Sequence, residues 1–454
     1  CLVGSEMCIR DSSYNKICYS YRFLLLICIF VISLNSTLLI KLQSPDCNIF
    51  IFLLSLYGKI VRMNSLVSTH IALLQDRVSS IRRGLMDRID RNSRLIAVKG
   101  SRGVGKTNFL LDYSKEYHPQ DNTCLYVNVN NLFIVNDGLF HFVEHFYKLG
   151  GKVLLLDQAH KYPEWDKELR ACYDAFPDLQ IIFTASSIVR IKSNAYLKGI
   201  VDMYNLSGLS FREFLELETN QTFPVYSFAD MVERHEEIVE DILKHVRPLA
   251  YFNNYLEYGY YPIYLEEKSH IDYLLKNINL TLEFDIPYAS QIELKYLVKL
   301  KQLLYIAAKD NTCNVNISKL SGLIGVSRAT VLNYLNYMKN ARLLTLLYDT
   351  DNDDDCGKKP KKLYIHNPNL LNAVCLEDVD TTVLRKSFFL SQLCPMSRIT
   401  YTERADFLVD GKYRIAVCGE GEGQKFDSSL VVMEDMIERG KGNIMPLWLA
   451  GFTY

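Results

Sequence analysis

Neither sign of charge dominates this 454-residue sequence, in which 51 Lys and Arg residues are balanced by 52 Asp and Glu residues. A formal net charge of -1 provides no bulk attraction to nucleic acid or to an anionic membrane. Any such binding therefore needs a local patch of basic side chains.

Cysteine and histidine patterns that bind metals are also missing. The twelve cysteines are scattered, without a CxxC pair or a regular framework. This is typical of reduced cysteines in a cytosolic protein, and not of disulfides or a zinc site. His141 and His145 lie one helical turn apart in HFVEH, which is not HExxH, so we interpret them as part of a helix face.

The length predicts two to four domains, and 49% hydrophobic with 23% charged residues fits a soluble globular protein. Residues 1–62 need a separate interpretation. The segment 1–12, CLVGSEMCIRDS, resembles a translated sequencing adaptor, and we expect the protein itself to begin at Met63. The alternative is a membrane anchor, because residues 23–40 are uncharged over 18 positions.

Short apolar runs alternate with amphipathic segments from Arg94 onward. The apolar runs predict strands, and the segments between them predict helices after Lys106 and near 137–149 and 165–175. Buried strands separated by helices indicate a parallel sheet covered on both faces, a three-layer α/β fold. The predicted strands are 95–98, 124–130, 152–158 and 179–186. From Lys362 to Tyr454 the pattern predicts a second, mixed α/β region with strands at 363–367, 405–410, 413–418 and 444–449.

Residues 100–107 read GSRGVGKT, which matches the phosphate-loop pattern GxxxxGK[ST]. The motif follows a predicted strand and opens a predicted helix, which is the context that it requires. Glycines let backbone N–H groups face phosphates, the lysine contacts the β- and γ-phosphates, and the threonine holds magnesium. The expected ATP site consists of Gly100, Ser101, Arg102, Gly103, Val104, Gly105, Lys106 and Thr107.

The run VLLLDQAH at 153–160 supplies the second half of this site. Asp157 follows a buried strand and is expected to support Mg²⁺ together with Thr107. Hydrolysing enzymes of this class usually have a glutamate next, but Gln158 stands here. Glutamine can orient a water molecule but cannot accept its proton, which predicts slow or absent hydrolysis. Thr184, at the end of the next strand, is predicted to sense the γ-phosphate.

The segment 317–344 has a two-helix pattern with a turn at Gly325. Ser327 caps the second helix, whose apolar residues at i, i+3, i+4 and i+7 are Val331, Tyr334, Leu335 and Met338. Arg328, Asn333 and Asn336 lie off that stripe and predict contact with DNA. The alternative is a packing or oligomerisation module, and the neighbouring acidic run at 351–355 opposes DNA binding.

These motifs, with SFREFLE at 210–216 and MPLWLAGFTY at 445–454, resemble one prokaryotic family. It comprises AAA-type ATPases with a helical lid, a winged helix and a C-terminal restriction-endonuclease-like domain. The resemblance covers about 75–454. It implies an ATPase domain at 63–210, a helical lid or connector at 211–310, a winged helix at 311–362 and the nuclease-like domain at 363–454.

The chain departs from this family at functional positions. Ile200 stands where relatives tend to have an arginine. Arg190 and Arg212 are candidates for charge near the phosphates, but the sequence assigns this role to neither. Nuclease-type domains place an Asp and then Glu-x-Lys on adjacent strands. Asp406 fits the first acid, but Ala416 occupies the second position. We therefore expect a structural or docking domain without nuclease activity.

The sequence predicts a cytoplasmic switch that binds ATP and Mg²⁺, hydrolyses ATP slowly and engages DNA or a protein partner, without a membrane if residues 1–62 are foreign. One alternative is an active ATPase. A second alternative is a DNA-binding regulator that acts through the winged helix.

Overall fold

The computed structural model describes residues 61, 63–75, 82–119, 123–265, 269–290, 292–310, 312–349, 358–375 and 379–454. Within these ranges, Leu66–Tyr454 forms one compact unit. The adaptor-like segment at 1–12, the apolar stretch at 23–40 and the acidic run at 351–355 lie outside the described residues.

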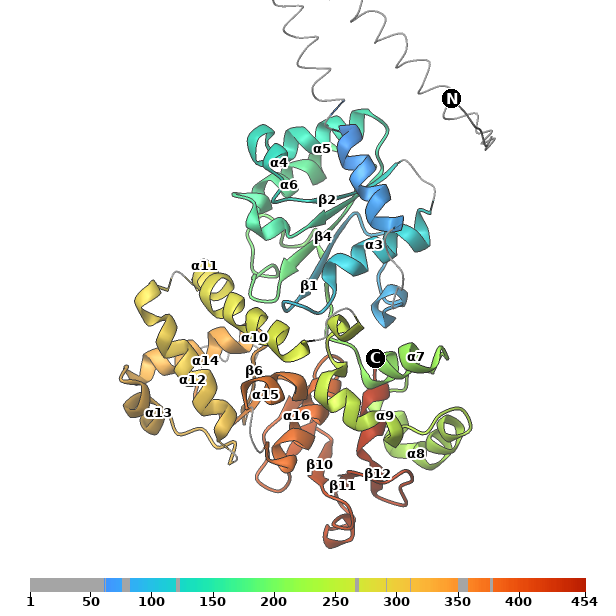
Figure 1. Cartoon of the computed structure of the whole chain (residues 1–454), viewed down its shortest axis with the longest axis vertical. Coiled ribbons are helices and arrows are strands. Elements are labelled where there is room, and N and C mark those ends of the chain that lie inside the picture. The colour runs from blue at the N-terminus through green and yellow to red at the C-terminus, as the bar shows by residue number, and fades with distance from the viewer. Residues whose placement is uncertain are drawn as a thin grey trace, which may run out of the picture. The chain divides into compact units, whose positions relative to one another are not determined.

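Five parallel strands form the first sheet, in the order β2-β3-β4-β1-β5. Strands β1, β2 and β4 of this sheet are labelled in Figure 1. The five strands are β1 (Leu95–Gly100), β2 (Cys124–Asn128), β3 (Val153–Asp157), β4 (Gln180–Ser186) and β5 (Asp202–Asn205). The first four confirm the predicted strands. The fifth was not predicted, because DMYN is short and partly exposed and lacks an apolar run.

Helices cover both faces of this sheet. α3 (Lys106–Tyr117) leads from β1 to the outer strand β2, whereas α5 (Leu139–Lys148) and α6 (Trp165–Ala175) lead back in the opposite direction. Because such crossovers are right-handed, α3 lies on one face and α5 and α6 lie on the other (Figure 1). The predicted three-layer P-loop NTPase fold is confirmed.

The helix expected near 137–149 is confirmed as α5, and a short helix that was not predicted, α4 (Leu132–Asp137), precedes it. α4 ends, and α5 begins, at Gly138, whose φ of 88° interrupts the helical backbone. A glycine adopts this conformation without the steric cost that a Cβ would add.

Residues 211–310 are helical, as predicted. The region contains α-helices, 3-10 turns and two π-helical turns, η3 and η5. Its elements are α7 (Phe211–Thr219), α8 (Phe228–Leu243), α9 (Leu249–Asn254), η3 (Tyr255–Gly259), η4 (Pro262–Leu265), α10 (His270–Leu280), η5 (Thr281–Asp285), α11 (Ile286–Ser290), η6 (Leu294–Tyr296) and α12 (Leu297–Lys309).

A helix-turn-helix comes next, formed by α13 (Ile317–Ile324) and α14 (Arg328–Asn340). Gly325 has a φ of 66° in the turn, and the Ser327 hydroxyl accepts a hydrogen bond from the Thr330 N–H at 3.1 Å. The four apolar residues predicted for the stripe are buried. Sequence pattern and tertiary packing therefore agree in this segment.

An antiparallel hairpin of β6 (Leu344–Leu347) and β7 (Lys362–Ile365) succeeds α14. The strand predicted at 363–367 thus exists, but it pairs with β6 and not with the C-terminal sheet. Its assignment to the C-terminal α/β region was wrong, because periodicity predicts a strand without identifying its partner.

The C-terminal sheet has the order β12-β11-β10-β9-β8 and is mixed, with β10–β12 parallel and β8–β10 antiparallel. Phe389 stacks on Phe407 with ring centroids 5.3 Å apart, which packs α16 on this sheet. The strand expected at 444–449 ends at Pro446 and continues as a 3-10 helix. The elements are α15 (Pro368–Val374), α16 (Thr381–Leu393), β8 (Ile399–Thr400), β9 (Phe407–Val409), β10 (Tyr413–Cys418), η7 (Gly423–Lys425), β11 (Val431–Glu434), β12 (Ile444–Pro446) and η8 (Leu447–Phe452).

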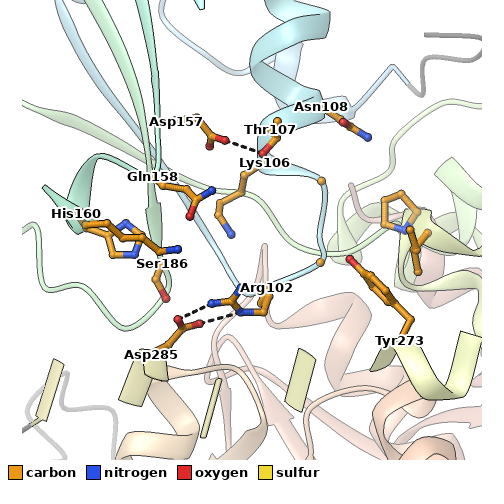
Figure 2. A pocket seen from close by; sticks show the side chains of 15 residues that line it. Arg102, Lys106, Thr107, Asn108, Asp157, Gln158, His160, Ser186, Tyr273 and Asp285 are labelled. Atoms are coloured by element: carbon orange, nitrogen blue, oxygen red, sulfur yellow. Dashed lines mark hydrogen bonds and ion pairs between the residues drawn. The ribbon is translucent and has the colours of Figure 1, made fainter. Parts of the chain in front are cut away.

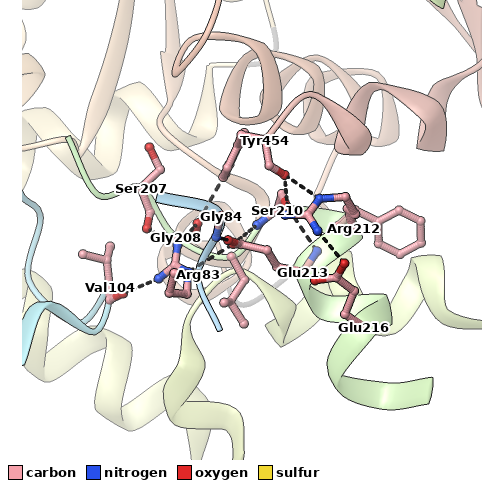
Figure 3. A network of polar contacts seen from close by, with 12 residues as sticks. Arg83, Gly84, Val104, Ser207, Gly208, Ser210, Arg212, Glu213, Glu216 and Tyr454 are labelled. Carbon is pink, nitrogen blue, oxygen red and sulfur yellow. Dashed lines mark hydrogen bonds and ion pairs between the residues drawn. The ribbon is translucent and has the colours of Figure 1, made fainter. Parts of the chain in front are cut away.

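A buried arginine near the start of this unit links three segments of the chain (Figure 3). Arg83 precedes a short 3-10 turn, η1 (Gly84–Asp87), and its side chain is 5% exposed. Its guanidinium donates to the Glu213 carboxylate at 3.1 Å, to the Val104 carbonyl at 3.0 Å and to the carbonyls of Ser207 and Gly208 at 2.8 Å. One side chain thus connects the phosphate loop with the segment before α7 and with α7 itself.

Glu213 completes the link to the end of the chain. It belongs to a capping box with Ser210, whose hydroxyl donates to the Tyr454 carbonyl at 2.8 Å. Burial opposes ionisation, but Arg83 and Arg212 hold the pKa of Glu213 below its ordinary value. The Arg212 side chain also donates to the Tyr454 carbonyl, at 3.0 Å, so α7 and the C-terminal segment share one buried polar network.

We predict that Arg83→Ala lowers the free energy of unfolding by about 3–5 kcal/mol, because it leaves the buried Glu213 carboxylate without its cation. Arg82 offers a matched control, since its ion pair with Asp87 is exposed (52% and 62%) and Arg82→Ala should cost about 1 kcal/mol or less. Urea unfolding of both variants measures the difference. Equal losses would contradict a central role for Arg83.

Candidate functional site

The phosphate loop joins β1 to α3, as predicted, and its backbone depends on two glycines. Gly103 and Gly105 have φ values of 87° and 92°, a region that residues with a Cβ rarely adopt. A Cβ on Gly103 would also lie 3.1 Å from the Asn277 amide nitrogen and 3.3 Å from the Tyr261 ring. The helical region therefore packs directly against this loop.

Lys106 is the first residue of α3, and its ammonium group turns back onto the loop. It donates to the carbonyls of Gly100 and Ser101 at 2.9 and 2.8 Å. Burial lowers the pKa of Lys106 to about 8, and the carboxylates of Asp157 and Asp285 act in the opposite direction. This cation is held within reach of the space enclosed by the loop.

Asp157 lies at the end of β3 and accepts three side-chain hydroxyl hydrogen bonds, although it is 1% exposed. The donors are Thr107 at 2.8 Å, Thr184 at 2.6 Å and Tyr126 at 3.1 Å. Side chains from the two neighbouring strands, β2 and β4, and from the start of α3 therefore converge on one buried carboxylate. Tyr126 was not predicted, because nothing in its own sequence context marks it as a partner of Asp157.

Gln158 comes directly after Asp157 and has a φ of 58°, the left-handed conformation. Its backbone N–H donates to the Thr184 hydroxyl at 2.8 Å, and its side chain lines the pocket. The Thr184 hydroxyl thus donates a hydrogen bond to Asp157 and accepts one from the backbone of Gln158. It positions these two residues, whereas the neighbouring Ser186 lines the pocket itself.

A pocket of about 330 Å³ opens over the phosphate loop (Figure 2). One side consists of loop residues and strand ends, and the other side belongs to the helical region. The volume lies at the lower end of the range for small-molecule sites. The lining residues are Arg102, Gly103, Gly105, Lys106, Thr107, Asn108, Asp157, Gln158, His160, Lys161, Ser186, Pro262, Ile263, Tyr273 and Asp285.

Sequence reasoning missed His160, which is 8% exposed and lines this pocket. Its Nδ1 atom has no hydrogen-bond partner among the described residues. Burial, together with the charges of Lys106, Lys161 and Arg102, lowers the pKa of His160 to about 3, so the imidazole is neutral at pH 7. Its place three residues after Asp157 is the one signal that could have identified it.

Neither of the two candidate arginines lines the pocket over the phosphate loop. Arg212 belongs to the buried network with Tyr454 and Glu216 and does not line the pocket. Arg190 lines a second cavity of about 490 Å³, together with His160 and with Tyr337 and Asn340 of α14.

The predicted DNA-contacting residues lie on α14, outside the pocket over the phosphate loop. Arg328 and Asn333 are exposed, at the first and second turns of the helix. Asn336 is half-buried, and its Oδ1 lies 3.5 Å from the Tyr348 hydroxyl. Two of the three predicted side chains are therefore accessible to a partner.

In the C-terminal sheet, Asp406 forms an ion pair with Lys386 of α16 and accepts the Val417 N–H at 2.9 Å. The side chain of Ala416 is buried, and Glu420 is exposed. In the part of the chain that the structure describes, no group of three or more His, Cys, Asp or Glu side chains could hold a metal ion. The same part contains no helix that is both long and apolar enough to span a bilayer.

Residues 92–215 match the family model of an AAA domain. This match covers the strands of the first sheet, the phosphate loop, Asp157 and the first half of α7, so this part of the chain is similar to an AAA domain. Residues 249–382 match a domain of unknown function (DUF8612), from α9 into the start of α16. The second match identifies a shared domain and no activity.

An uncharacterized protein of Methanocaldococcus jannaschii is 23% identical over 308 residues, 64% of this chain. The match spans 66% of that relative, slightly less than two thirds of its length. Solved structures with similarity include AMPPCP-bound DnaA from Aquifex aeolicus, at 14% sequence identity and a TM-score of 0.25. They also include the replication initiator DnaA bound to AMPPCP and single-stranded DNA, at 13% sequence identity and a TM-score of 0.25. Each matches 59% of this chain, and they cover 90% and 92% of their own chains.

We predict that Thr184→Val destabilises the protein by about 1–3 kcal/mol, because the buried Asp157 carboxylate loses its shortest hydrogen bond. Ser187→Ala is the control, since the buried Ser187 hydroxyl has no partner among the described residues and its removal should change stability by less than about 0.5 kcal/mol. Thermal unfolding of the two variants distinguishes them. A neutral Thr184→Val would mean that Asp157 is held by other groups.

Proposed function

We propose that this protein is an ATP-binding, magnesium-dependent nucleotide switch of AAA type that hydrolyses ATP slowly. The observation that carries the proposal is the convergence of Lys106, Thr107 and Asp157 in one pocket, with the Thr107 hydroxyl 2.8 Å from the Asp157 carboxylate. A cation, a hydroxyl and a carboxylate in this order are what a magnesium–triphosphate group needs.

The charges around the pocket favour one orientation of ATP. The phosphates would lie against the loop N–H groups and the ammonium group of Lys106, at the positive end of α3. Mg²⁺ usually takes one or two protein oxygens in addition to substrate phosphates and waters. Thr107 would coordinate it directly, and Asp157 would hold its waters, because the Asp157 oxygens already accept from Thr184 and Tyr126.

The opposite end of the pocket suits a ribose and base. Pro262 and Ile263 of η4 and Tyr273 of α10 offer apolar and aromatic surface there, next to Asn108 of α3. Aromatic and aliphatic side chains commonly bury the planar part of a small ligand. We therefore propose that the helical region contributes the base-binding surface.

Gln158 supports slow hydrolysis. It borders the pocket next to Asp157, but an amide cannot accept the proton of the attacking water. The neutral imidazole of His160 lies in the same pocket as a second polar group, which leaves the active-ATPase alternative open. The cytoplasmic location proposed with this function is supported by the cysteines in the described ranges, which form no disulfide.

The other parts of the chain would respond to the nucleotide. We propose that the helix-turn-helix and its hairpin act as a winged helix, and that the C-terminal mixed sheet is a restriction-endonuclease-like domain without a metal site. The ion pair between Lys386 and Asp406 supports the absence of a metal site in this domain, since the ammonium group already neutralises the Asp406 carboxylate. These parts would then dock partners and would not cleave nucleic acid.

We expect residues 63–454 to bind MgATP with micromolar affinity, and Lys106→Ala to abolish binding by removing the phosphate-facing cation. Gln158→Glu should raise turnover, because a carboxylate can accept the proton of the attacking water. Calorimetry measures binding, and phosphate release measures turnover. Wild-type turnover equal to that of Gln158→Glu would favour the active-ATPase alternative, and absence of binding would refute the proposal.

The DNA-binding alternative rests on the exposure of Arg328 and Asn333 on α14. It predicts salt-sensitive binding to random duplex DNA that weakens in Arg328→Ala, because each lost phosphate contact reduces the salt dependence. A gel-shift series in increasing salt tests this, with Arg82→Ala as a control at an exposed arginine far along the chain. No shift at low salt would exclude direct DNA binding by α14.

A further inference from the structure

The third residue of the phosphate loop is tied to the helical region by an ion pair inside the pocket. Arg102 donates to both oxygens of Asp285, at 2.6 Å and 3.2 Å (Figure 2). The two side chains are 28% and 12% exposed. Asp285 is the last residue of the π-helical turn η5, and it lines the pocket opposite Gln158 and Lys106. This two-point geometry is the strongest form of an arginine–carboxylate pair.

Both loop cations in the pocket are therefore occupied by protein oxygens. Lys106 is bonded to two loop carbonyls, and Arg102 is bonded to Asp285. Asp285 also adds a second carboxylate to a pocket that already holds Asp157. A ligand with several negative charges must compete with Asp285 for Arg102 and lie close to its carboxylate, where like charges repel.

We propose that Asp285 is a latch that holds the helical lid on the phosphate loop while the pocket is empty, and that nucleotide phosphates displace it from Arg102. This inference rests on the proposed ATP binding and assigns to one residue the control of nucleotide affinity. The lid segment concerned is 281–290, which comprises η5 and α11.

Displacement of Asp285 would also affect the helix-turn-helix, because α11, the helix that follows Asp285, contacts it. α11 begins at the residue after Asp285 and contacts α14. Tyr288 of α11 also donates from its hydroxyl to the His160 carbonyl at 3.3 Å. Release of Asp285 would therefore loosen a segment that lies between the pocket and α14, which is how nucleotide would alter the surface offered to a partner.

A neighbouring ion pair provides a control that distinguishes a latch from an ion pair that only stabilises the turn η5. Glu283 lies two residues before Asp285 in the same turn and pairs with Lys301 at 2.6 Å, but its side chain is 37% exposed and it does not line the pocket. Substitution of Glu283 removes an ion pair from the same turn without touching the phosphate loop. It is the matched control for Asp285.

The test compares wild type, Asp285→Asn and Glu283→Gln as full chains. Calorimetry should show that Asp285→Asn tightens MgATP binding about tenfold, within the range of ordinary coupling between sites. Glu283→Gln should stay within about twofold of wild type. Unchanged or weaker binding in Asp285→Asn would overturn the latch, since Asp285 would then orient Arg102 for the nucleotide instead of competing with it.

Hydrogen exchange of residues 281–290 tests the latch without nucleotide. In nucleotide-free protein, exchange in this segment should be faster in Asp285→Asn than in wild type and in Glu283→Gln, and MgATP should accelerate it in wild type. Equal exchange in nucleotide-free Asp285→Asn and wild type would overturn the latch whatever ATP does. Failure of wild type to bind ATP would instead refute the proposed function, while the nucleotide-free comparison would still decide the latch.

Discussion

The buried guanidinium of Arg83 is the contact on which the arrangement of the nucleotide site depends. It bonds to the phosphate loop at Val104, to the segment before α7 at Ser207 and Gly208, and to Glu213 within α7. A buried arginine is tolerated only when its donors and its charge are satisfied, so these segments must keep their relative positions. Through Ser210 and Arg212 the same network fixes the Tyr454 carbonyl. Through Arg83, the phosphate loop is thus linked to residues 207–213, which lie more than a hundred positions later in the chain.

Ion pairs and hydrogen bonds within the protein satisfy four charged groups that line the pocket, those of Arg102, Lys106, Asp157 and Asp285. Lys106 bonds to loop carbonyls, Arg102 to Asp285, and Asp157 to three hydroxyl groups. A phosphate ligand must therefore exchange existing contacts for new ones, and its affinity is the difference between two sets of bonds. In such a site, the residues that compete with the ligand determine affinity as much as the residues that bind it. The rigid support from Arg83 and the exchangeable pair at Arg102 then have complementary roles, on opposite sides of the same loop.

Acidic side chains at the C-terminal sheet are also neutralised by cations of the same chain. Lys386 pairs with Asp406, and Arg385 donates to Asp435 at 2.6 Å, so cations of α16 neutralise acids of the sheet. Aromatic packing, such as Phe389 on Phe407, then attaches α16 to β9. The segment after β12 returns to α7, where Gly451 leaves no room for a Cβ against Phe211. These contacts make the C-terminal region a support for α7 and hence, through Glu213, for the phosphate loop.

The sequence by itself determined the local elements: the phosphate loop with its following helix, four of the five strands of the first sheet, the helical region and the two-helix turn at Gly325. Glycine spacing, apolar periodicity and capping act within a few residues, so a single sequence predicts their results. Tertiary structure alone decided which strands pair with β5 and β7 and which residue pairs with Asp285. It also decided that Arg212 is buried and that His160 lines the pocket. These outcomes depend on contacts between residues far apart in the chain, about which local patterns carry no information. An isolated arginine such as Arg83 or Arg102 acquires its role only from the carboxylate that the fold brings to it.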